Sequence, residues 1–423
     1  MRVALIGPVP PRLGGATSGG VATHQVHLAA GLAAAGLFAP LLATNTRTPP
    51  AHSRAGDAEA PFPLYRMGRP RRARGQYLAA VGPHRMAWYA LRLAFGRQAG
   101  SRREILANLL WYRRFLAHVR PDLIHVQHPL DRCSFARDVM RLEGWKMPLV
   151  VTAHSLYGEH TEATIESIMA PNLRAADRVI AVSPHIADQA MQLGVQSRRV
   201  RVIRSGVDAE HFSPRPQARA AARASLGISP ETRLVLFVGN LEPRKQVDVL
   251  LRALASVRGN VPEAALIVVG SGESGGVQDQ TARLSRLTHD LGLEAEDAVR
   301  FIGWADDAQL LDYYAAADVF ALPSSSEAQG IVALEAMACA LPVVATAVGG
   351  LLGTIQDGRT GFLVPPGDVE ALAERLQVLL VDEGRRQVIG AAARQAVERE
   401  FSWARAIEAT IEVYREVLEC PPA

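Results

Sequence analysis

Two glutamates, Glu327 and Glu335, stand eight positions apart in an otherwise uncharged segment. The pattern predicts a loop that holds Glu327, a helix from about Gly330 to Ala340 that carries Glu335, and a buried strand from Pro342. An ionised glutamate in so apolar a helix needs a polar partner. Glu335 either pairs with a nearby arginine or binds a polar ligand, and Glu327 either caps the helix N-terminus or binds that ligand too.

Two cations, Arg244 and Lys245, lie about ninety residues upstream. The apolar run from Leu234 to Val238 predicts a buried strand that Gly239 ends, and Lys245 is predicted to open an amphipathic helix. Both cations would then lie at a helix N-terminus, which favours anions, and a guanidinium adds bidentate phosphate recognition. The alternative is a pair of solvated surface cations.

Both segments resemble those of retaining glycosyltransferases of the family-four type, also called glycosyl transferases group 1. Glu327 to Glu335 is similar to the family's two glutamates separated by seven residues, and Gly239 to Lys245 to its Gly-x-Leu-x-x-x-Lys element. The resemblance implies that Glu327 contacts the donor sugar, Glu335 the nucleotide ribose, and the two cations the diphosphate. The donor and nucleotide site that it implies comprises Gly19, Gly20, Gly239, Asn240, Arg244, Lys245, Gly330, Ile331, Val332 and Glu335.

Two positions depart from the family pattern. Asn240 stands where many relatives carry arginine, so one phosphate contact is expected to be missing. Gln329-Gly330 replaces the commoner Phe-Gly, which predicts an altered sugar pocket.

The N-terminus predicts a strand at Val3–Ile6, a glycine- and proline-rich loop over residues 7–20, and a helix from Val21 to Ala35. Turns need glycine for their own geometry, and this loop has no G-x-G-x-x-G. Its resemblance to the family's Gly-Gly-Val opening implies that Gly19 and Gly20 lie under the donor diphosphate.

His154 follows a buried strand. A histidine there is commonly a hydrogen-bonded structural residue, but the match to the family's Thr-x-His element implies contact with the donor sugar or the acceptor near the reacting carbon. The catalytic candidates are therefore Glu327, His154, Arg244 and Lys245. Four other histidines have less support: His24, His27, His125 and His128.

No metal or other cofactor is expected. The pair Asp306-Asp307 is predicted to be the N-cap and first turn of a helix. Arg244 and Lys245 can neutralise the charge that a divalent ion neutralises elsewhere. The three cysteines show neither metal-ligand spacing nor a disulfide framework, which is typical of a reducing cytoplasm.

The length of 423 residues with 48% hydrophobic content favours two domains. Apolar runs alternate with helical patterns, which predicts an α/β fold of doubly wound parallel sheets. The predicted strands are Val3–Ile6, Leu41–Thr44, Leu123–Val126, Leu149–Thr152, Val179–Val182, Val200–Ile203, Leu234–Val238, Ala265–Val269, Val299–Ile302, Val319–Leu322, Val343–Ala345 and Phe362–Val364.

The resemblance implies the GT-B fold, with two Rossmann-like domains that face each other across a cleft. Residues 1–205 would form the acceptor side and residues 206–400 the nucleotide-sugar side. The last helix, within 401–423, resembles the family's crossover helix, which returns to the first domain.

The chain has no apolar run of eighteen residues and no secretory signal pattern, so a cytoplasmic protein is expected. Between Tyr65 and Arg120, arginines are interleaved with aromatic residues. This region either forms solvated helix faces that pack through their aromatics, or contacts an anionic membrane surface or a phosphorylated acceptor. No recognisable nucleic-acid motif accompanies the charge.

The resulting hypothesis is a retaining, metal-independent hexosyltransferase. It would move a sugar from a UDP, GDP or ADP sugar to a hydroxyl of a sugar, lipid-linked or small-molecule acceptor. The alternatives are a nucleotide-sugar epimerase or phosphorylase of the same fold, and a catalytically idle GT-B scaffold. A dehydrogenase is disfavoured because the N-terminal glycine loop lacks the dinucleotide fingerprint and the domain pattern is duplicated.

Overall fold

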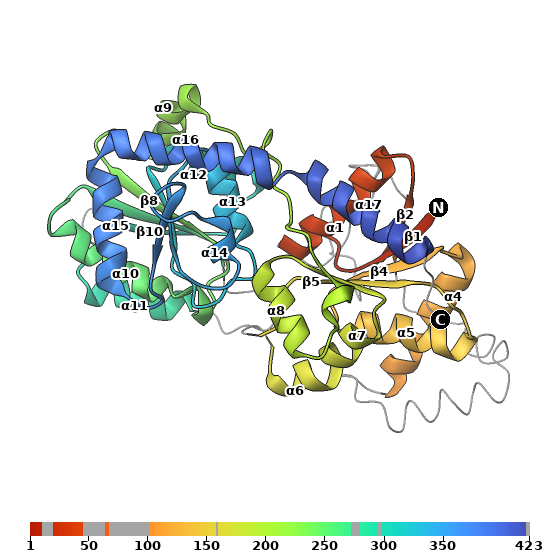
Figure 1. The fold of residues 1–423 in the computed structure, drawn as a ribbon. Coiled ribbons are helices and arrows are strands. Elements are labelled where there is room, and N and C mark those ends of the chain that lie inside the picture. Colours follow the sequence, from red (N-terminus) through yellow and green to blue (C-terminus); the bar gives the residue numbers. More distant parts are fainter. Residues whose placement is uncertain are drawn as a thin grey trace. The chain divides into compact units, whose positions relative to one another are not determined.

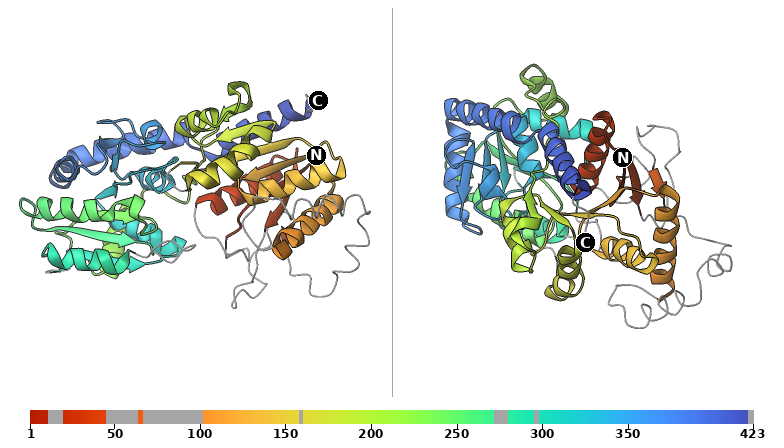
Figure 2. Two further views of the ribbon diagram at one scale, coloured as in Figure 1. Left: turned by 90° about the horizontal axis from the view of Figure 1, so that it is seen from below. Right: turned by 45° about the vertical axis from the view of Figure 1, so that its right-hand side comes forward.

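The computed structural model describes residues 1–10, 20–44, 64–66, 102–157, 160–271, 280–294 and 298–419. The chain divides into two compact units, Met1–Arg204 with Ala406–Ala423, and Ser205–Arg405. Each unit is built on one parallel sheet, and helices lie on both sides of each sheet (Figures 1 and 2).

The first unit has a seven-stranded sheet in the order β3-β2-β1-β4-β5-β6-β7. Its strands are β1 (Arg2–Ile6), β2 (Ala39–Thr44), β3 (Leu64–Arg66), β4 (Leu123–Gln127), β5 (Leu149–Ala153), β6 (Arg178–Ala181) and β7 (Val200–Val202). Its helices are α1 (Gly20–Ala34), α4 (Arg102–Val119), α5 (Asp131–Glu143), α6 (Glu162–Thr164), the π-helix η2 (Ile165–Met169), α7 (Ala170–Ala175), α8 (Pro184–Gln192) and the 3₁₀ turn η3 (Ser197–Arg199). The chain returns to this unit through α17 (Trp403–Glu419).

The second unit has a six-stranded sheet in the order β10-β9-β8-β11-β12-β13. Its strands are β8 (Arg233–Val238), β9 (Ala264–Val269), β10 (Val299–Gly303), β11 (Val319–Leu322), β12 (Val343–Thr346) and β13 (Gly361–Val364). Its helices are α9 (Pro216–Ser225), the 3₁₀ turn η4 (Pro243–Lys245), α10 (Val247–Arg258), α11 (Thr281–Asp290), α12 (Asp307–Ala316), α13 (Ile331–Ala338), α14 (Leu351–Thr354), α15 (Val369–Val381) and α16 (Glu383–Glu400).

The predicted fold class is confirmed, since both sheets are parallel and doubly wound. All twelve predicted strands are present, and each bound lies within two residues of its prediction. They are apolar because parallel strands are covered on both faces. Leu64–Arg66 was not predicted, because three residues are too few to show a periodic pattern.

Strand order reverses at one place in each sheet. β9 and β10 lie on one side of β8 and β11 lies on the other, so the second sheet reverses between β8 and β11. In the first sheet the reversal falls between β1 and β4. Open α/β sheets bind ligands at such points, outside the carboxyl ends of the strands.

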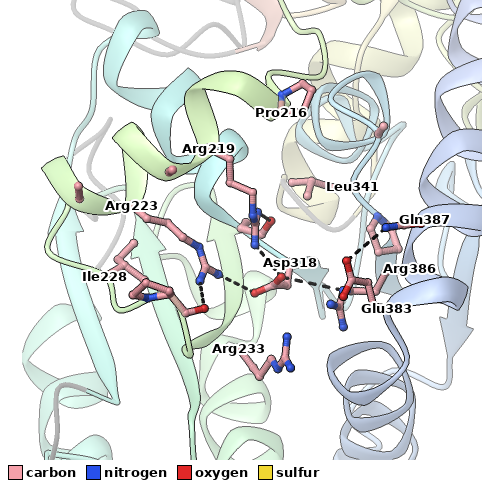
Figure 3. Close-up of a pocket in the computed structure, with 16 residues that line it drawn as sticks. Pro216, Arg219, Arg223, Ile228, Arg233, Asp318, Leu341, Glu383, Arg386 and Gln387 are labelled. Carbon is pink, nitrogen blue, oxygen red and sulfur yellow. Dashed lines mark hydrogen bonds and ion pairs between the residues drawn. The ribbon is translucent and has the colours of Figure 1, made fainter.

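Asp318 organises the opposite, amino end of the second sheet. Its carboxylate accepts a hydrogen bond from Leu234 N at 2.8 Å. It also accepts from Arg219 Nη2 at 2.7 Å and from Arg223 Nη2 at 2.8 Å (Figure 3). Arg223 also donates to four main-chain carbonyls, those of Ala316, Ser229, Pro230 and Thr232. One buried carboxylate therefore joins α9, the end of α12 and the starts of β8 and β11.

We expect Asp318→Asn to destabilise the second unit by roughly 3–5 kcal/mol, because the change leaves buried guanidinium groups without their counter-charge. Chemical unfolding followed by tryptophan fluorescence measures the loss. Asp290→Asn, at an exposed position at the end of α11, is the control. Equal unfolding midpoints for the two variants would contradict the role given to Asp318.

Candidate active site

A buried ion pair joins Lys245 to Glu327 at the carboxyl end of the second sheet. The ammonium contacts Glu327 Oε1, and both side chains are 9% exposed. Ser324 Oγ donates to the same oxygen at 2.9 Å, and Arg244 Nη1 lies 3.9 Å away. β8 and β11 are adjacent and parallel, so the loops that follow them meet at one end of the sheet. The donors to Glu327 are Lys245 and Ser324, and within the described residues no main-chain N–H of α13 donates to it, so Glu327 does not cap that helix.

Glu327 is held in its ionised form. Burial raises the pKa of its carboxyl, but Lys245 first and Arg244 second oppose burial, and the net pKa lies below the usual value. An ammonium has three N–H donors, so Lys245 can hold Glu327 and still donate to a ligand.

The expectation that Lys245 opens a helix is wrong. Pro243–Lys245 forms a 3₁₀ turn, Gln246 takes the left-handed conformation with φ 46°, and α10 begins only at Val247. Hydrogen bonds from Lys245 N to Glu242 O at 2.9 Å and from Gln246 N to Pro243 O at 3.1 Å close the turn. The two cations are therefore placed by carboxylates and not by the end of a helix.

Arg244 lies at the edge of this site, with 20% of its side chain exposed. Its Nε donates to Glu242 Oε2 at 2.7 Å, and its Nη1 donates to Ser326 O at 3.4 Å. Asn240 is exposed and donates to Glu242 Oε1 at 3.4 Å. Glu242, which sequence reasoning did not single out, thus orients both residues.

Glycine is required where β8 and β9 end. Gly239 has φ 155°, and a Cβ on Gly270 would lie 1.9 Å from Gly239 O. Gly270 also begins a G-x-G-x-x-G run that continues to Gly275. The G-x-G-x-x-G pattern is therefore absent from the N-terminal loop but present elsewhere in the chain. Residues 272–279 lie outside the described part, so the structural context of this run is untested.

Glu335 lies half-buried on α13, with Tyr314 as its partner. The Tyr314 hydroxyl donates to Glu335 Oε2 at 2.9 Å. Burial raises the pKa of Glu335 to about 7, while the hydrogen bond from Tyr314 opposes this rise. The partner is therefore a tyrosine on α12 and not the arginine considered from sequence.

The start of α13 is fixed by close packing. Gly330 has φ 81°, and a Cβ there would lie 2.5 Å from Leu351 Cδ2. Ile331 and Val332 form the half-buried first turn. Gln329 is buried, accepts from Ser205 N at 2.8 Å and donates to Ser205 O at 2.8 Å. This glutamine thus holds the main chain at the start of the second unit.

The first unit places His154 at the carboxyl end of β5. His154 is buried, and its Nε2 lies 2.9 Å from Gln127 Oε1 at the end of β4. Because an amide oxygen only accepts, Nε2 carries the proton and Nδ1 is left as an acceptor. The ring of His24, on α1, lies edge-on at 4.6 Å.

A second buried histidine supports the first through neighbouring strands. His125 Nε2 lies 2.7 Å from Thr152 Oγ1, and its Nδ1 lies 2.6 Å from the Tyr414 hydroxyl on α17. Gln127 Nε2 approaches His125 at 3.4 Å. Tyr414, His125 and Gln127 therefore form a polar chain that leads to His154.

These histidines are neutral near pH 7. Burial lowers the pKa of His24, His125 and His128 to about 3 and that of His154 well below its usual value. They can offer hydrogen bonds but carry no positive charge. Within the described residues, the buried atoms that lack a hydrogen-bond partner include His128 Nδ1 and, on α1, Gln25 Oε1.

Of the two predicted loop glycines, Gly20 is the exposed first residue of α1, and Gly19 lies outside the described residues. A contact of either with a diphosphate stays a prediction.

Comparison with known proteins agrees with this geometry. The family model "Glycosyl transferases group 1" matches residues 218–396, and "Glycosyltransferase Family 4" matches residues 18–211. D-inositol 3-phosphate glycosyltransferase from Saccharomonospora viridis is 37% identical over 314 residues, which cover 70% of each chain. The chain belongs to this glycosyltransferase family.

Solved structures share the GT-B fold of this glycosyltransferase over nearly its whole length. Sucrose-phosphate synthase from Thermosynechococcus elongatus is 26% identical with a TM-score of 0.76, and 99% of each chain is covered. Anabaena HepE, solved in complex with UDP and glucose, is 21% identical with a TM-score of 0.74, and 98% of this chain and 100% of HepE are covered.

The aspartate pair of the glycosyltransferase is a helix cap, as predicted. Asp306 accepts from Gln309 N at 2.9 Å, and Gln309 Oε1 accepts from Asp306 N at 3.1 Å, which completes a capping box at α12. Among the described residues, no group of three or more His, Cys, Asp or Glu side chains is placed to hold a metal ion. Metal independence itself stays a prediction.

The basic region is described only in part. On α4, Tyr112 and Phe115 are buried, and Arg113 pairs with Glu143 at 2.9 Å. The side chains from Arg66 to Arg97 lie outside the described residues, so contact with a membrane or an acceptor is untested. Across the described ranges, no helix is long and apolar enough to cross a bilayer.

Glu335 should make the stability of the ligand-free enzyme depend on pH. Its pKa is about 7 in the folded chain against 4.5 ordinarily, so the folded state keeps a proton that the unfolded state releases. The stabilisation is complete below the ordinary pKa and is lost as the pH rises through about 7. At pH 8, Glu335→Gln should therefore be more stable than the wild type by on the order of 2 kcal/mol.

Thermal melts from about pH 5 to pH 8.5 test this linkage. The control is Glu374→Gln, at an exposed position on α15. If the melting temperatures of the wild type and of Glu335→Gln change with pH in parallel, Glu335 is ionised in both the folded and the unfolded chain across this range.

Proposed function

We propose that this glycosyltransferase is a retaining hexosyltransferase that needs no metal and uses a nucleoside-diphosphate sugar. The observation that carries the proposal is the buried Lys245–Glu327 pair beside Arg244, at the point where strand order reverses. It combines a fixed carboxylate with two cations at the end of the sheet where open α/β folds bind ligands.

Each half of the donor has a matching group in the second unit. Lys245 and Arg244 are suited to the diphosphate, because both are cations that Glu327 and Glu242 hold in place, and because charged N–H groups form strong hydrogen bonds to phosphate oxygens. Glu335 is suited to the ribose hydroxyls, and the Tyr314 hydrogen bond fixes its orientation. A Cβ on Gly239 would lie 3.8 Å from Lys245 Cε, so glycine keeps the main chain at the end of β8 close to this cation.

The reaction breaks the bond between the anomeric carbon and the diphosphate oxygen. A bond from the acceptor oxygen to that carbon forms on the same face, and the acceptor proton passes to the departing oxygen. Arg244 and Lys245 stabilise the negative charge that grows on the diphosphate. Glu327, held by Lys245 and Ser324, orients the sugar by accepting from its hydroxyls.

The acceptor hydroxyl is proposed to bind to the first unit near His154. Its neutral imidazole offers Nδ1 as an acceptor, and His128 Nδ1 and Gln25 Oε1 offer further polar contacts. D-inositol 3-phosphate is the first acceptor to test, because the S. viridis relative is named for it.

Two measurements test the proposal. A thermal-shift panel of UDP, GDP, ADP and TDP with their sugars identifies the donor, since ligand at a hundred times its Kd stabilises by roughly 2.7 kcal/mol. Proton NMR of the product then reports whether the anomeric configuration is retained. Inverted product would overturn the retaining mechanism. Epimerised donor, phosphate-dependent cleavage, or binding without turnover would favour an epimerase, a phosphorylase or an idle scaffold.

We expect transfer to persist in EDTA and to collapse in Arg244→Ala. Loss of one preorganised cation opposite the leaving group should cost roughly 3–4 kcal/mol, a hundredfold to a thousandfold in kcat. Arg244→Lys should recover part of this, because an ammonium lacks the bidentate fork. Activity abolished by EDTA and restored by Mg²⁺ or Mn²⁺ would refute metal independence.

The two glutamates should differ in what they control. Glu327→Gln should lower kcat more than it weakens nucleotide binding, because it removes the charge that orients the sugar beside Lys245. Glu335→Gln should weaken nucleotide binding more than kcat. Steady-state kinetics and calorimetry with the nucleotide separate the two effects. If both variants change kcat and nucleotide affinity only slightly and to the same extent, neither glutamate belongs to the active site.

A further inference from the structure

A cavity of about 680 Å³ lies at the amino end of the second sheet, away from the Lys245–Glu327 pair. Arg233 begins β8, and Asp318 and Pro342 directly precede β11 and β12. The donor-site residues follow β8 and β11, so they lie at the opposite end of the same strands. The proposed transfer reaction makes no use of this cavity.

The cavity carries an excess of positive charge. Its lining includes four arginines and two carboxylates, which leaves two positive charges: Arg219, Arg223, Arg233 and Arg386 against Asp318 and Glu383. In Figure 3 Arg219 and Arg223, from α9, and Arg386, from α16, point toward Asp318, and Arg233 lies beside this group.

Hydrogen bonds within the protein engage the guanidinium group of Arg223, but within the described ranges they leave some N–H groups of the other arginines without an acceptor. Arg223 gives its N–H groups to Asp318 and four carbonyls. In the part of the chain that the structure describes, the hydrogen bonds of Arg386 come from Nη1, which donates to Leu379 O at 2.7 Å and Leu380 O at 2.9 Å. The Arg386 side chain is 9% exposed. Its Nε remains 3.9 Å from Asp318 Oδ1.

Of the four arginines, Arg233 has the most side-chain N–H groups without a hydrogen bond among the described residues. Its side chain donates no hydrogen bond in the described part of the chain, and its ion-pair partner Glu263 lies at 4.0 Å with 46% of its side chain exposed. Arg219 likewise leaves Nε unused after donating to Asp318 and two carbonyls. Unused N–H groups from α9, β8 and α16 therefore border one cavity.

We propose that this cavity binds a small phosphorylated molecule, with Arg233, Arg386 and Arg219 donating to the phosphate oxygens. Planar guanidinium groups suit a phosphate because two N–H groups can reach two of its oxygens. The cavity volume falls in the range of small-molecule sites. The remainder of the ligand would lie against an apolar wall formed by Pro216, Ala220, Ala224, Ile228, Leu341 and Pro342.

The test uses calorimetry to measure the binding of inorganic phosphate and of phenyl phosphate to the 423-residue chain. Phenyl phosphate should bind more tightly, because its ring can cover the apolar wall. Arg233→Gln should weaken this binding by at least about tenfold, the equivalent of one charge-assisted hydrogen bond. Arg233→Lys should recover part of it, and binding should weaken as salt is raised.

Two variants separate this cavity from the donor site. Arg252→Gln, at an exposed position on α10, is the matched control and should bind phosphate as the wild type does. Arg244→Ala should also keep this binding, whether or not the transferase mechanism holds. The proposal fails if the wild type does not bind phosphate, if Arg233→Gln binds it unchanged, or if Arg244→Ala abolishes it.

Discussion

The arrangement of the second unit depends on the ion pair that Lys245 and Glu327 form below the surface. Removing two charges from water is costly, and their attraction offsets that cost only with good geometry and further hydrogen bonds. Ser324 supplies one such bond, at 2.9 Å to Glu327. Ser325 N also donates to Arg244 O at 2.7 Å, so main-chain contact joins the same two loops. The pair thereby fixes the loops after β8 and β11 before any substrate arrives.

The two units bury their polar side chains in different ways. The second keeps opposite charges together, which suits an anionic ligand. The first buries imidazoles in their neutral form and connects them through Gln127 and Tyr414. A neutral network can hold a hydroxyl without attracting a diphosphate. Under the proposed function, the end of the second sheet would bind the donor and the end of the first sheet the acceptor.

Burial explains what could be predicted from sequence and what could not. Apolar runs such as Leu234 to Val238 identify strands, because both faces of a parallel sheet are covered. The start of α10 could not be located, because it depends on the left-handed conformation of one residue, Gln246. Tyr314 and Gln127 escaped notice because each partners a residue on another element, and sequence spacing does not report such contacts.

The late position of α17 in the sequence affects how the first unit folds during synthesis. His125 and Tyr414 both belong to the first unit, but they are far apart in the sequence. In the fold, His125 Nδ1 lies 2.6 Å from the Tyr414 hydroxyl. Glu416 on the same helix also pairs with Arg178 at 3.1 Å. Domains generally fold as units during synthesis. The ribosome completes every residue of Ser205–Arg405 before it releases α17, so the domain that is begun first is the one whose polar core closes last.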